Sequence, residues 1–353
     1  MDKNSYQVQQ KLKYTAKLRG LEAILPSFCF DFFRGIDQTT GVKTRIAYAY
    51  DLIVFFDFLF KELYKDENKD NLLVDFLDKI TPEDIERYLE YLSYFTKINV
   101  NTQKIVEHAN DEKAKARKLA SLRTFYKYFY KKRKIKNNPA ILVDLPKIHQ
   151  KDIVRLEVDE AVKLLDEIES GNALTKFQQK YHSKTKLRDL ALISLLLGTG
   201  IRVSECVGLD TNDIDMSTNG IKITRKGGNE VIVYFSDEVK YALLDYIQER
   251  KLLIPESGHE NALFLSLQNK RLNVRSVQNL VKKYSILVTN LKKISPHKLR
   301  STYGTNLYRE TGDIYLVADV LGHKDVNTTK KHYAQIDDEQ RRRAAKIVKL
   351  REV

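Results

Sequence analysis

Residues 187–209 read LRDLALISLLLGTGIRVSECVGL. The run up to residue 200 is mostly apolar and ends at glycines, which predicts a buried core helix that stops near Gly200. Arg202 follows that stop, and Glu205 comes three residues later, a spacing at which two side chains share one helical face. The stretch therefore predicts a core helix that presents a charged pair at its end, with Glu205 orienting its neighbour.

Outward from this stretch, the periodicity predicts helices and one small sheet. Residues 221–235, IKITRKGGNEVIVYF, alternate like two short strands around a turn at residues 226–229, which is a hairpin signal. The first 145 or so residues are expected to be almost wholly helical. A core helix is predicted over Ile46–Leu63, and a helix start at Thr81 followed by Pro82. The fold class is therefore mainly α with a small β-sheet.

A break in the helical pattern divides the chain in two. Pro139 and Pro146 interrupt any helix in NNPAILVDLPKIHQKD, and a helical pattern restarts in RLEVDEAVKLLDEI. The length of 353 residues is enough for two domains. We place a linker at about residues 144–154, between a helical domain over residues 1–145 and a mixed domain over residues 155–353.

The net charge points to a polyanionic partner. Lysine and arginine exceed aspartate and glutamate by 14, and the isoelectric point is near 9.4. Such a balance favours nucleic acid or an anionic membrane surface. No run approaches the roughly 18 apolar residues of a spanning helix, and the polar start lacks the apolar core of a signal peptide. Cys29 and Cys206 lie far apart without metal-ligand spacing, so we expect a reducing cytoplasm and no disulfide.

One segment of the first domain concentrates the positive charge. Residues 113–136 contain eleven basic residues and no acid. Apolar and aromatic side chains fall on one helical face there, while a second face carries basic side chains, namely Arg123, Lys127, Lys131 and Lys134. A solvated surface opposite a core face would give the same pattern. Because no acid compensates the charge, we predict that this face contacts DNA.

Six residues suited to phosphodiester chemistry occur in order along the second domain: Arg202, Lys226, His297, Arg300, His323 and Tyr333. A guanidinium is always charged and can donate two hydrogen bonds to phosphate oxygens. A lysine can protonate a leaving oxygen, and a tyrosine can attack phosphorus if its proton is removed. Each residue also has an ordinary structural reading, as a surface arginine, a turn lysine, a cap or core histidine, or a packing tyrosine. The histidines lack acid or cysteine partners at zinc-ligand spacing.

The flanks of these residues, GTGIRVSECVGL, TRKGGN, SPHKLR and LGHKDV, resemble those of the tyrosine recombinases, the integrase family that includes the bacterial Xer proteins. The resemblance implies a helical SAM-like core-binding domain that clamps DNA and a mixed α/β catalytic domain. It implies that Tyr333 is the nucleophile and Lys226 the general acid, and that no metal or ATP is required. His297 would help to handle the proton of the nucleophile, and His323 would bind a phosphate oxygen.

This chain departs from the family pattern at two places. Arg225 stands where the family frequently has glycine, which makes it the rival of Lys226 as general acid and a further candidate for DNA contact. The step from His323 to Tyr333 is ten residues instead of the usual nine. Residues 337–353 read as a short carboxyl-terminal helix, which the family often lends to a neighbouring protomer.

The resemblance implies a site-specific recombinase in which four identical protomers synapse two double-stranded DNA sites in the cytoplasm, at the nucleoid and away from membranes. Its task would be chromosome dimer resolution, phage integration or transposon movement. Two other classes stay open: a type IB topoisomerase, which uses the same residue types as a monomer, and a non-catalytic DNA-binding protein. The flanks and the long helical region before them favour recombination.

Overall fold

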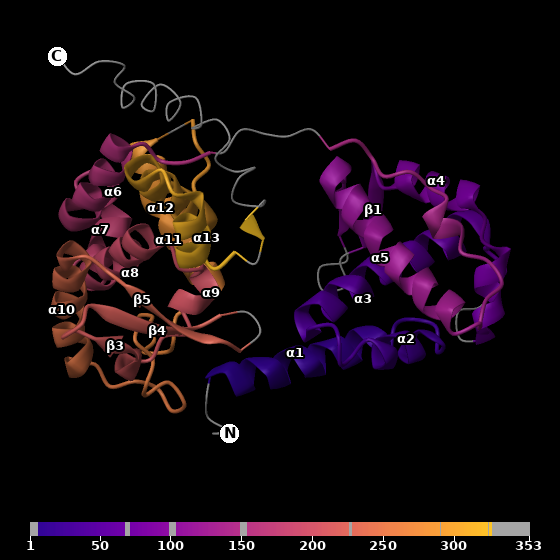
Figure 1. The fold of residues 1–353 in the computed structure, drawn as a ribbon, viewed down its shortest axis with the longest axis horizontal. Helices are drawn as coiled ribbons and strands as arrows, with labels where there is room; N and C mark the ends of the chain where they lie inside the picture. The colour runs from indigo at the N-terminus through magenta and orange to yellow at the C-terminus, as the bar shows by residue number, and fades with distance from the viewer. Residues whose placement is uncertain are drawn as a thin grey trace, which may run out of the picture. The chain divides into compact units, whose positions relative to one another are not determined.

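The structure is a computed structural model that describes residues 6–67, 71–98, 104–148, 154–225, 228–289, 291–323 and 325–326. The chain divides into two compact units, Met1–Gln150 and Lys151–Val353, which are described separately below (Figure 1). Within the described residues, none of the helices combines the length and the apolar character needed to cross a membrane.

The first unit is built from helices and one two-stranded hairpin. Its regular elements are α1 (Tyr6–Glu22), α2 (Cys29–Gly35), α3 (Val42–Phe58), the π-helical turn η1 (Leu59–Leu63), the 3-10 helix η3 (Val74–Lys79), α4 (Pro82–Tyr91), β1 (Phe95–Ile98), β2 (Ile105–His108), α5 (Glu112–Lys131) and the 3-10 turn η4 (Pro139–Ile141). The predicted helix start is confirmed, because the Thr81 hydroxyl accepts from the Asp84 amide and Pro82 opens α4.

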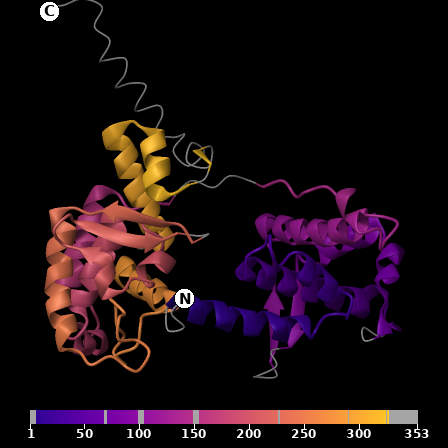
Figure 2. The ribbon, with the colours of Figure 1, turned by 60° about the horizontal axis from the view of Figure 1, so that its bottom comes forward.

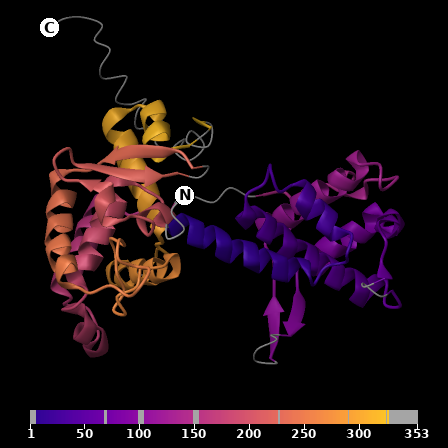
Figure 3. The same cartoon turned by 90° about the horizontal axis from the view of Figure 1, so that it is seen from below.

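The hairpin corrects the prediction that this region is almost wholly helical. β1 and β2 pair antiparallel, with Phe95 opposite His108 and Ile98 opposite Ile105, and Figure 3 shows them projecting from the helices of the unit. Both strands are short runs that contain β-branched residues, FTKI and IVEH. Four residues give too few repeats to separate a strand from a helix by periodicity alone.

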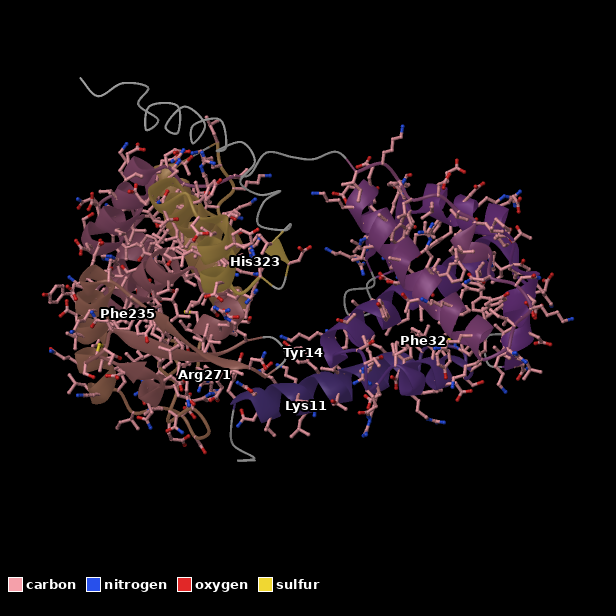
Figure 4. The ribbon with its side chains drawn as sticks, viewed as in Figure 1. Lys11, Tyr14, Phe32, Phe235, Arg271 and His323 are labelled. Atoms are coloured by element: carbon pink, nitrogen blue, oxygen red, sulfur yellow. The ribbon has the colours of Figure 1, made fainter. Side chains whose placement is uncertain are left out.

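Aromatic side chains fill the core of the first unit. Phe32, labelled in Figure 4, contacts Phe125 edge-on with ring centroids 5.2 Å apart. Phe55 packs on Tyr88 in the same manner at 5.1 Å. Edge-to-face pairs place the positive rim of one ring against the negative face of another, which adds to the gain from burial. The predicted core helix is confirmed, because α3 and η1 bury most of the residues between Ile46 and Leu59.

The second unit surrounds one buried helix. Its elements are α6 (Val158–Ser170), α7 (Lys176–His182), α8 (Lys186–Thr199), α9 (Val203–Cys206), the 3-10 turn η5 (Thr211–Asp213), β3 (Ile214–Asp215), β4 (Gly220–Thr224), β5 (Glu230–Tyr234), α10 (Asp237–Leu252), α11 (Val274–Val288), α12 (Pro296–Thr311) and α13 (Ile314–Leu321). α8 packs against α6, α10 and α12 (Figure 2). The prediction of a core helix ending at glycine is confirmed, since α8 is capped by Gly200.

A small antiparallel sheet lies beside the helices of this unit. Its order is β3-β4-β5, and Ile221 faces Val233 across the central pair. The predicted hairpin around residues 226–229 is therefore confirmed by β4 and β5. Ser295 and Pro296 begin α12, although the serine hydroxyl makes no capping hydrogen bond there. The β4–β5 hairpin contains the TRKGGN motif, and the start of α12 contains the SPHKLR motif.

Candidate active site

The end of α8 places the first charged pair of the site. Gly200 has φ +63°, and a Cβ atom there would lie within 3 Å of the side chains of Tyr303 and Leu321, so glycine suits both the turn and the space. Arg202 follows at the N-cap of α9. Its Nη1 donates to Glu205 Oε1 at 2.8 Å, and its backbone amide donates to Glu205 Oε2 at 2.7 Å. Glu205 is buried and orients Arg202, as its spacing predicted.

Arg300 reaches the same place from α12. Its side chain is buried, with 5% of its surface exposed. Nη1 donates to the carbonyl oxygen of Gly200 at 2.6 Å, and Nη2 donates to the carbonyl oxygen of Leu321. One guanidinium therefore ties the end of α8 to the end of α13. Arg202 completes the junction, because its Nη2 donates to the Gly322 carbonyl oxygen at 3.1 Å.

A third arginine reaches this junction from the hairpin. Arg225 directly follows β4, and it donates from Nη1 to the Asp319 carbonyl oxygen at 3.2 Å and from Nη2 to the Val320 carbonyl oxygen at 2.8 Å. The carbonyl oxygens of residues 319–322 thus accept from three guanidinium groups that belong to three different parts of the unit. We call Arg202, Arg225 and Arg300 the arginine cluster.

The cluster suits the electrostatics of a helix end. The last carbonyl groups of a helix lack intrahelical donors and carry partial negative charge. At the end of α13 two are satisfied locally, because His323 donates its amide to the Ala318 oxygen and Gly322 donates to the Asp319 oxygen. The next three carbonyl oxygens, those of Val320, Leu321 and Gly322, accept from the arginine cluster. Glu205 pairs with Arg202 in this cluster, and the other contacts given above are to uncharged carbonyl oxygens.

The two histidines, His297 and His323, are close in sequence to residues that form the junction. His297 is exposed in the first turn of α12, three residues before Arg300. His323 is half-buried directly after the glycine that caps α13, where Figure 4 labels it. The structure therefore joins the segments that carry Arg202, Arg300 and His323 by hydrogen bonds. Lys226 and Tyr333 lie outside the described residues, as does the predicted carboxyl-terminal helix.

Two further features define the chemistry near the cluster. Cys206 is fully buried beside Glu205, and burial raises the pKa of its thiol well above the ordinary value, so the thiol stays protonated at neutral pH. Within the described ranges, no group of three or more histidine, cysteine, aspartate or glutamate side chains is arranged to hold a metal ion.

The basic side chains predicted to face DNA on α5 differ in their surroundings. Lys127 and Lys131 are exposed on α5. Lys134 is also exposed, but α5 ends at Lys131, so Lys134 does not share its helical face as predicted. Arg123 is half-buried, and its guanidinium donates to the carbonyl oxygens of Ala140 at 3.1 Å and Val143 at 2.5 Å. Arg123 thus has an internal role that the helical pattern did not indicate.

Sequence reasoning also missed that Arg225 binds the end of α13. In the structure, glycine at residue 322 of the LGH motif leaves room for this contact, since a Cβ atom there would lie within 3 Å of the Arg225 guanidinium. The partners are 94 and 95 residues apart in sequence, so no local pattern connects them.

Residues 154–340 match the model of the phage integrase family. The chain belongs to this family. It is 36% identical over 315 residues to "Tyrosine recombinase XerC" of Caldanaerobacter subterraneus subsp. tengcongensis, covering 86% of this chain and 80% of that protein. It is 28% identical over 364 residues to "Tyrosine recombinase XerS" of Streptococcus agalactiae, covering 94% and 98%. The chain is therefore a site-specific tyrosine recombinase, an enzyme that breaks and rejoins DNA, and this reading is preferred over the topoisomerase and the non-catalytic protein.

Solved structures agree with this family in fold. The XerH site-specific recombinase bound to palindromic difH substrate is 20% identical, with a TM-score of 0.62 and coverage of 87% of this chain and 80% of that one. The integrase of transposon Tn1549 in complex with a circular intermediate DNA is 19% identical, with a TM-score of 0.61 and coverage of 89% and 99%. The predicted fold class, mainly α with a small sheet, is confirmed.

Proposed function

We propose that Arg202 and Arg300 bind one phosphate of double-stranded DNA, which Tyr333 attacks. The observation that carries this proposal is the junction at the end of α13, where hydrogen bonds from Arg300 join Gly200 to Leu321 and Arg202 reaches Gly322. These bonds bring three motifs that are far apart in the chain into one site. Fixed cations in a mostly buried site stabilise the charge that develops on the non-bridging oxygens without reorganisation during the reaction.

The remaining motif residues account for the protons. The Tyr333 oxygen forms a bond to phosphorus as the bond to the 5′ oxygen breaks, and Lys226 gives a proton to that leaving oxygen. His297 takes part in removing the tyrosine proton, and His323 donates to a phosphate oxygen. The product is a 3′-phosphotyrosyl link and a free 5′ hydroxyl. The 5′ hydroxyl of the partner strand then attacks the link and releases the tyrosine, so ATP is not consumed.

Charge in this reaction comes from side chains of the chain itself. Guanidinium groups offset the charge of the phosphate, and the lysine gives a proton to the leaving oxygen. In other phosphoryl-transfer sites a divalent metal stabilises the charge on these oxygens. We therefore propose that cleavage needs no metal ion. Arg225 is not assigned to the phosphate, because its guanidinium donates to the end of α13.

The first unit is proposed to bind the DNA backbone. Lys127 and Lys131 on α5 and Lys134 just after it are exposed, and their ammonium groups can release counterions from a duplex. The solved structures that this chain resembles in fold include complexes with DNA, among them the XerH site-specific recombinase bound to palindromic difH substrate. By extension, four copies of this chain synapse two sites at the nucleoid in the cytoplasm, and residues 337–353 dock on a neighbouring copy. The task is chromosome dimer resolution or the movement of a phage or transposon.

The nucleophile is tested with a suicide duplex that is nicked near the cleavage site. The wild-type protein should form a denaturant-resistant adduct with this DNA, and Tyr333→Phe should form none, because the phenyl ring packs but cannot attack. Tyr315→Phe is the matched control, since Tyr315 is an exposed tyrosine of the same unit and should leave the adduct yield unchanged. An equal adduct yield from Tyr333→Phe would refute the nucleophile assignment. Adding EDTA should leave the wild-type adduct yield unchanged, and a loss of adduct that divalent metal restores would refute metal-free cleavage.

A further inference from the structure

Arg225 binds the active-site junction although the phosphate chemistry gives it no task. The guanidinium is half-buried and spans two successive carbonyl oxygens of α13, those of Asp319 at 3.2 Å and Val320 at 2.8 Å. Arg202 and Arg300 bond to the two following carbonyl groups.

The backbone of Arg225 is held as firmly as its side chain. Its amide donates to the Asn229 carbonyl oxygen at 2.8 Å, and its own carbonyl oxygen accepts from the Gly228 amide at 3.0 Å. Both bonds lie within the turn that joins β4 to β5. The side chain therefore connects this turn to the end of α13, and a displacement of either element would strain the same residue.

The contact needs the shape of an arginine. A planar guanidinium can donate to two neighbouring carbonyl oxygens at once, whereas a lysine ammonium acts as a single point charge. The positive charge also faces the negative end of the α13 dipole. Gly322 leaves room for the contact, because a Cβ atom there would lie within 3 Å of the guanidinium.

We propose that Arg225 is a positioning residue that fixes the β4–β5 turn to α13, so that Lys226 and His323 approach the same phosphate together. Lys226 is the next residue in the chain, and His323 lies three residues after the second acceptor, Val320. This inference rests on the proposed roles of those two residues. It replaces the prediction that Arg225 contacts DNA.

The first experiment separates positioning from DNA binding. Single-turnover cleavage of the suicide duplex and the dissociation constant are measured for wild type, Arg225→Ala and Arg225→Lys. Misplacement of a catalytic group by about 1 Å costs on the order of 100-fold in rate, so we expect both variants to cleave roughly 10- to 100-fold more slowly at an unchanged dissociation constant. Weakened binding of Arg225→Ala that Arg225→Lys restores would show a phosphate contact and overturn the proposal, because a lysine also neutralises phosphate.

The second experiment asks whether Arg225 acts through Lys226. Residues that work as one unit have non-additive effects. We therefore expect Arg225→Ala to slow cleavage much less in a Lys226→Ala background than in wild type. Fully additive losses would overturn the proposal. A 5′-bridging sulfur that restores cleavage to Arg225→Ala, but not to Lys226→Ala, would make Arg225 the general acid and would also overturn it.

A structural control guards against a general loss of stability. Arg250 makes the same kind of contact away from the junction, donating from Nε to the Ala262 oxygen at 3.0 Å and from Nη2 to the Glu260 oxygen at 2.8 Å. With all variants kept below their unfolding temperatures, Arg250→Ala should cleave at nearly the wild-type rate. Equal losses from Arg250→Ala and Arg225→Ala would show that the effect is only structural. Failure of the nucleophile assignment is detected separately, by an adduct from Tyr333→Phe.

Discussion

Cations in the two units of this recombinase meet different partners. In the first unit, Arg117 and Lys118 of α5 donate to the carboxylate of Asp51 on α3, at distances between 2.5 and 2.9 Å, and the Ser121 hydroxyl donates to it at 2.7 Å. Asp51 is 1% exposed. In the second unit, the arginine cluster donates mainly to uncharged carbonyl groups at the end of α13.

The difference distinguishes cations whose role is to stabilise the fold from cations that can bind a charged ligand. The Asp51 carboxylate offsets one of the two positive charges of Arg117 and Lys118 and holds both side chains within the fold, so less of their charge is available to DNA. Carbonyl dipoles orient a guanidinium without neutralising it. In the arginine cluster Glu205 pairs with Arg202, and the carbonyl contacts hold the guanidinium groups in place before a phosphate binds.

Asp51→Ala should have the largest effect, and the effect should be on stability. Removal of Asp51 leaves Lys118 buried without its counter-ion, which costs about 3–5 kcal/mol in the free energy of unfolding. Urea unfolding of the full chain measures this cost. Asp57→Ala is the control, since its pairing with Lys97 at 3.4 Å is partly exposed and should contribute about 0–1 kcal/mol. Equal costs from both variants would remove the distinction between the two kinds of charge.

Arg202→Ala should show the opposite behaviour, with a large loss of rate and a smaller loss of stability. Removal of one preorganised donor to a developing charge costs about 10²–10³-fold, which single-turnover cleavage measures. A 5′-bridging sulfur should not restore this variant, because the leaving group is not its target. The same substrate should restore Lys226→Ala, and a failure to do so would contradict the general-acid role of Lys226.

Truncation after Ile336 should affect assembly more than the site itself. The removed residues 337–353 are too few and too polar to form a stable isolated helix, so they need a surface on which to dock. If that surface belongs to a neighbouring copy, the truncated protein should bind one half-site normally and lose cooperative binding to two. Gel shifts on DNA with two half-sites measure this, and retained cooperativity together with normal recombination would contradict exchange of the tail.

Lys127→Ala should have the smallest effect, a few-fold weakening of DNA binding. Loss of one phosphate contact should lower the slope of the logarithm of affinity against the logarithm of salt concentration by about 1. Arg123→Ala is the comparison on the same helix, because the Arg123 guanidinium donates to Ala140 and Val143. It should lower stability and leave the salt slope unchanged. Equal slopes for Lys127→Ala and wild type would contradict a DNA contact at Lys127.

Features of the fold that depend on neighbouring residues were predictable from the chain alone. Apolar periodicity indicated α8 and its glycine end, β-alternation indicated the β4–β5 hairpin, and Thr81 with Pro82 indicated the start of α4. The β1–β2 hairpin was missed, because strands of four residues offer too short a pattern. The candidate site was found from the order and flanks of its motifs, since the residue types that bind a phosphate are few.

The sequence by itself determined which residue types reach the site, and the tertiary structure decided what each of them touches. Arg225 looked like a turn residue beside Lys226, yet packing places its guanidinium on α13, more than ninety residues away. Arg123 was predicted to lie on a basic face that contacts DNA, yet it donates to backbone carbonyl groups of its own unit. Partners so distant in sequence meet only after the helices have packed, and the carbonyl oxygens they share carry no side-chain signature that a sequence could display.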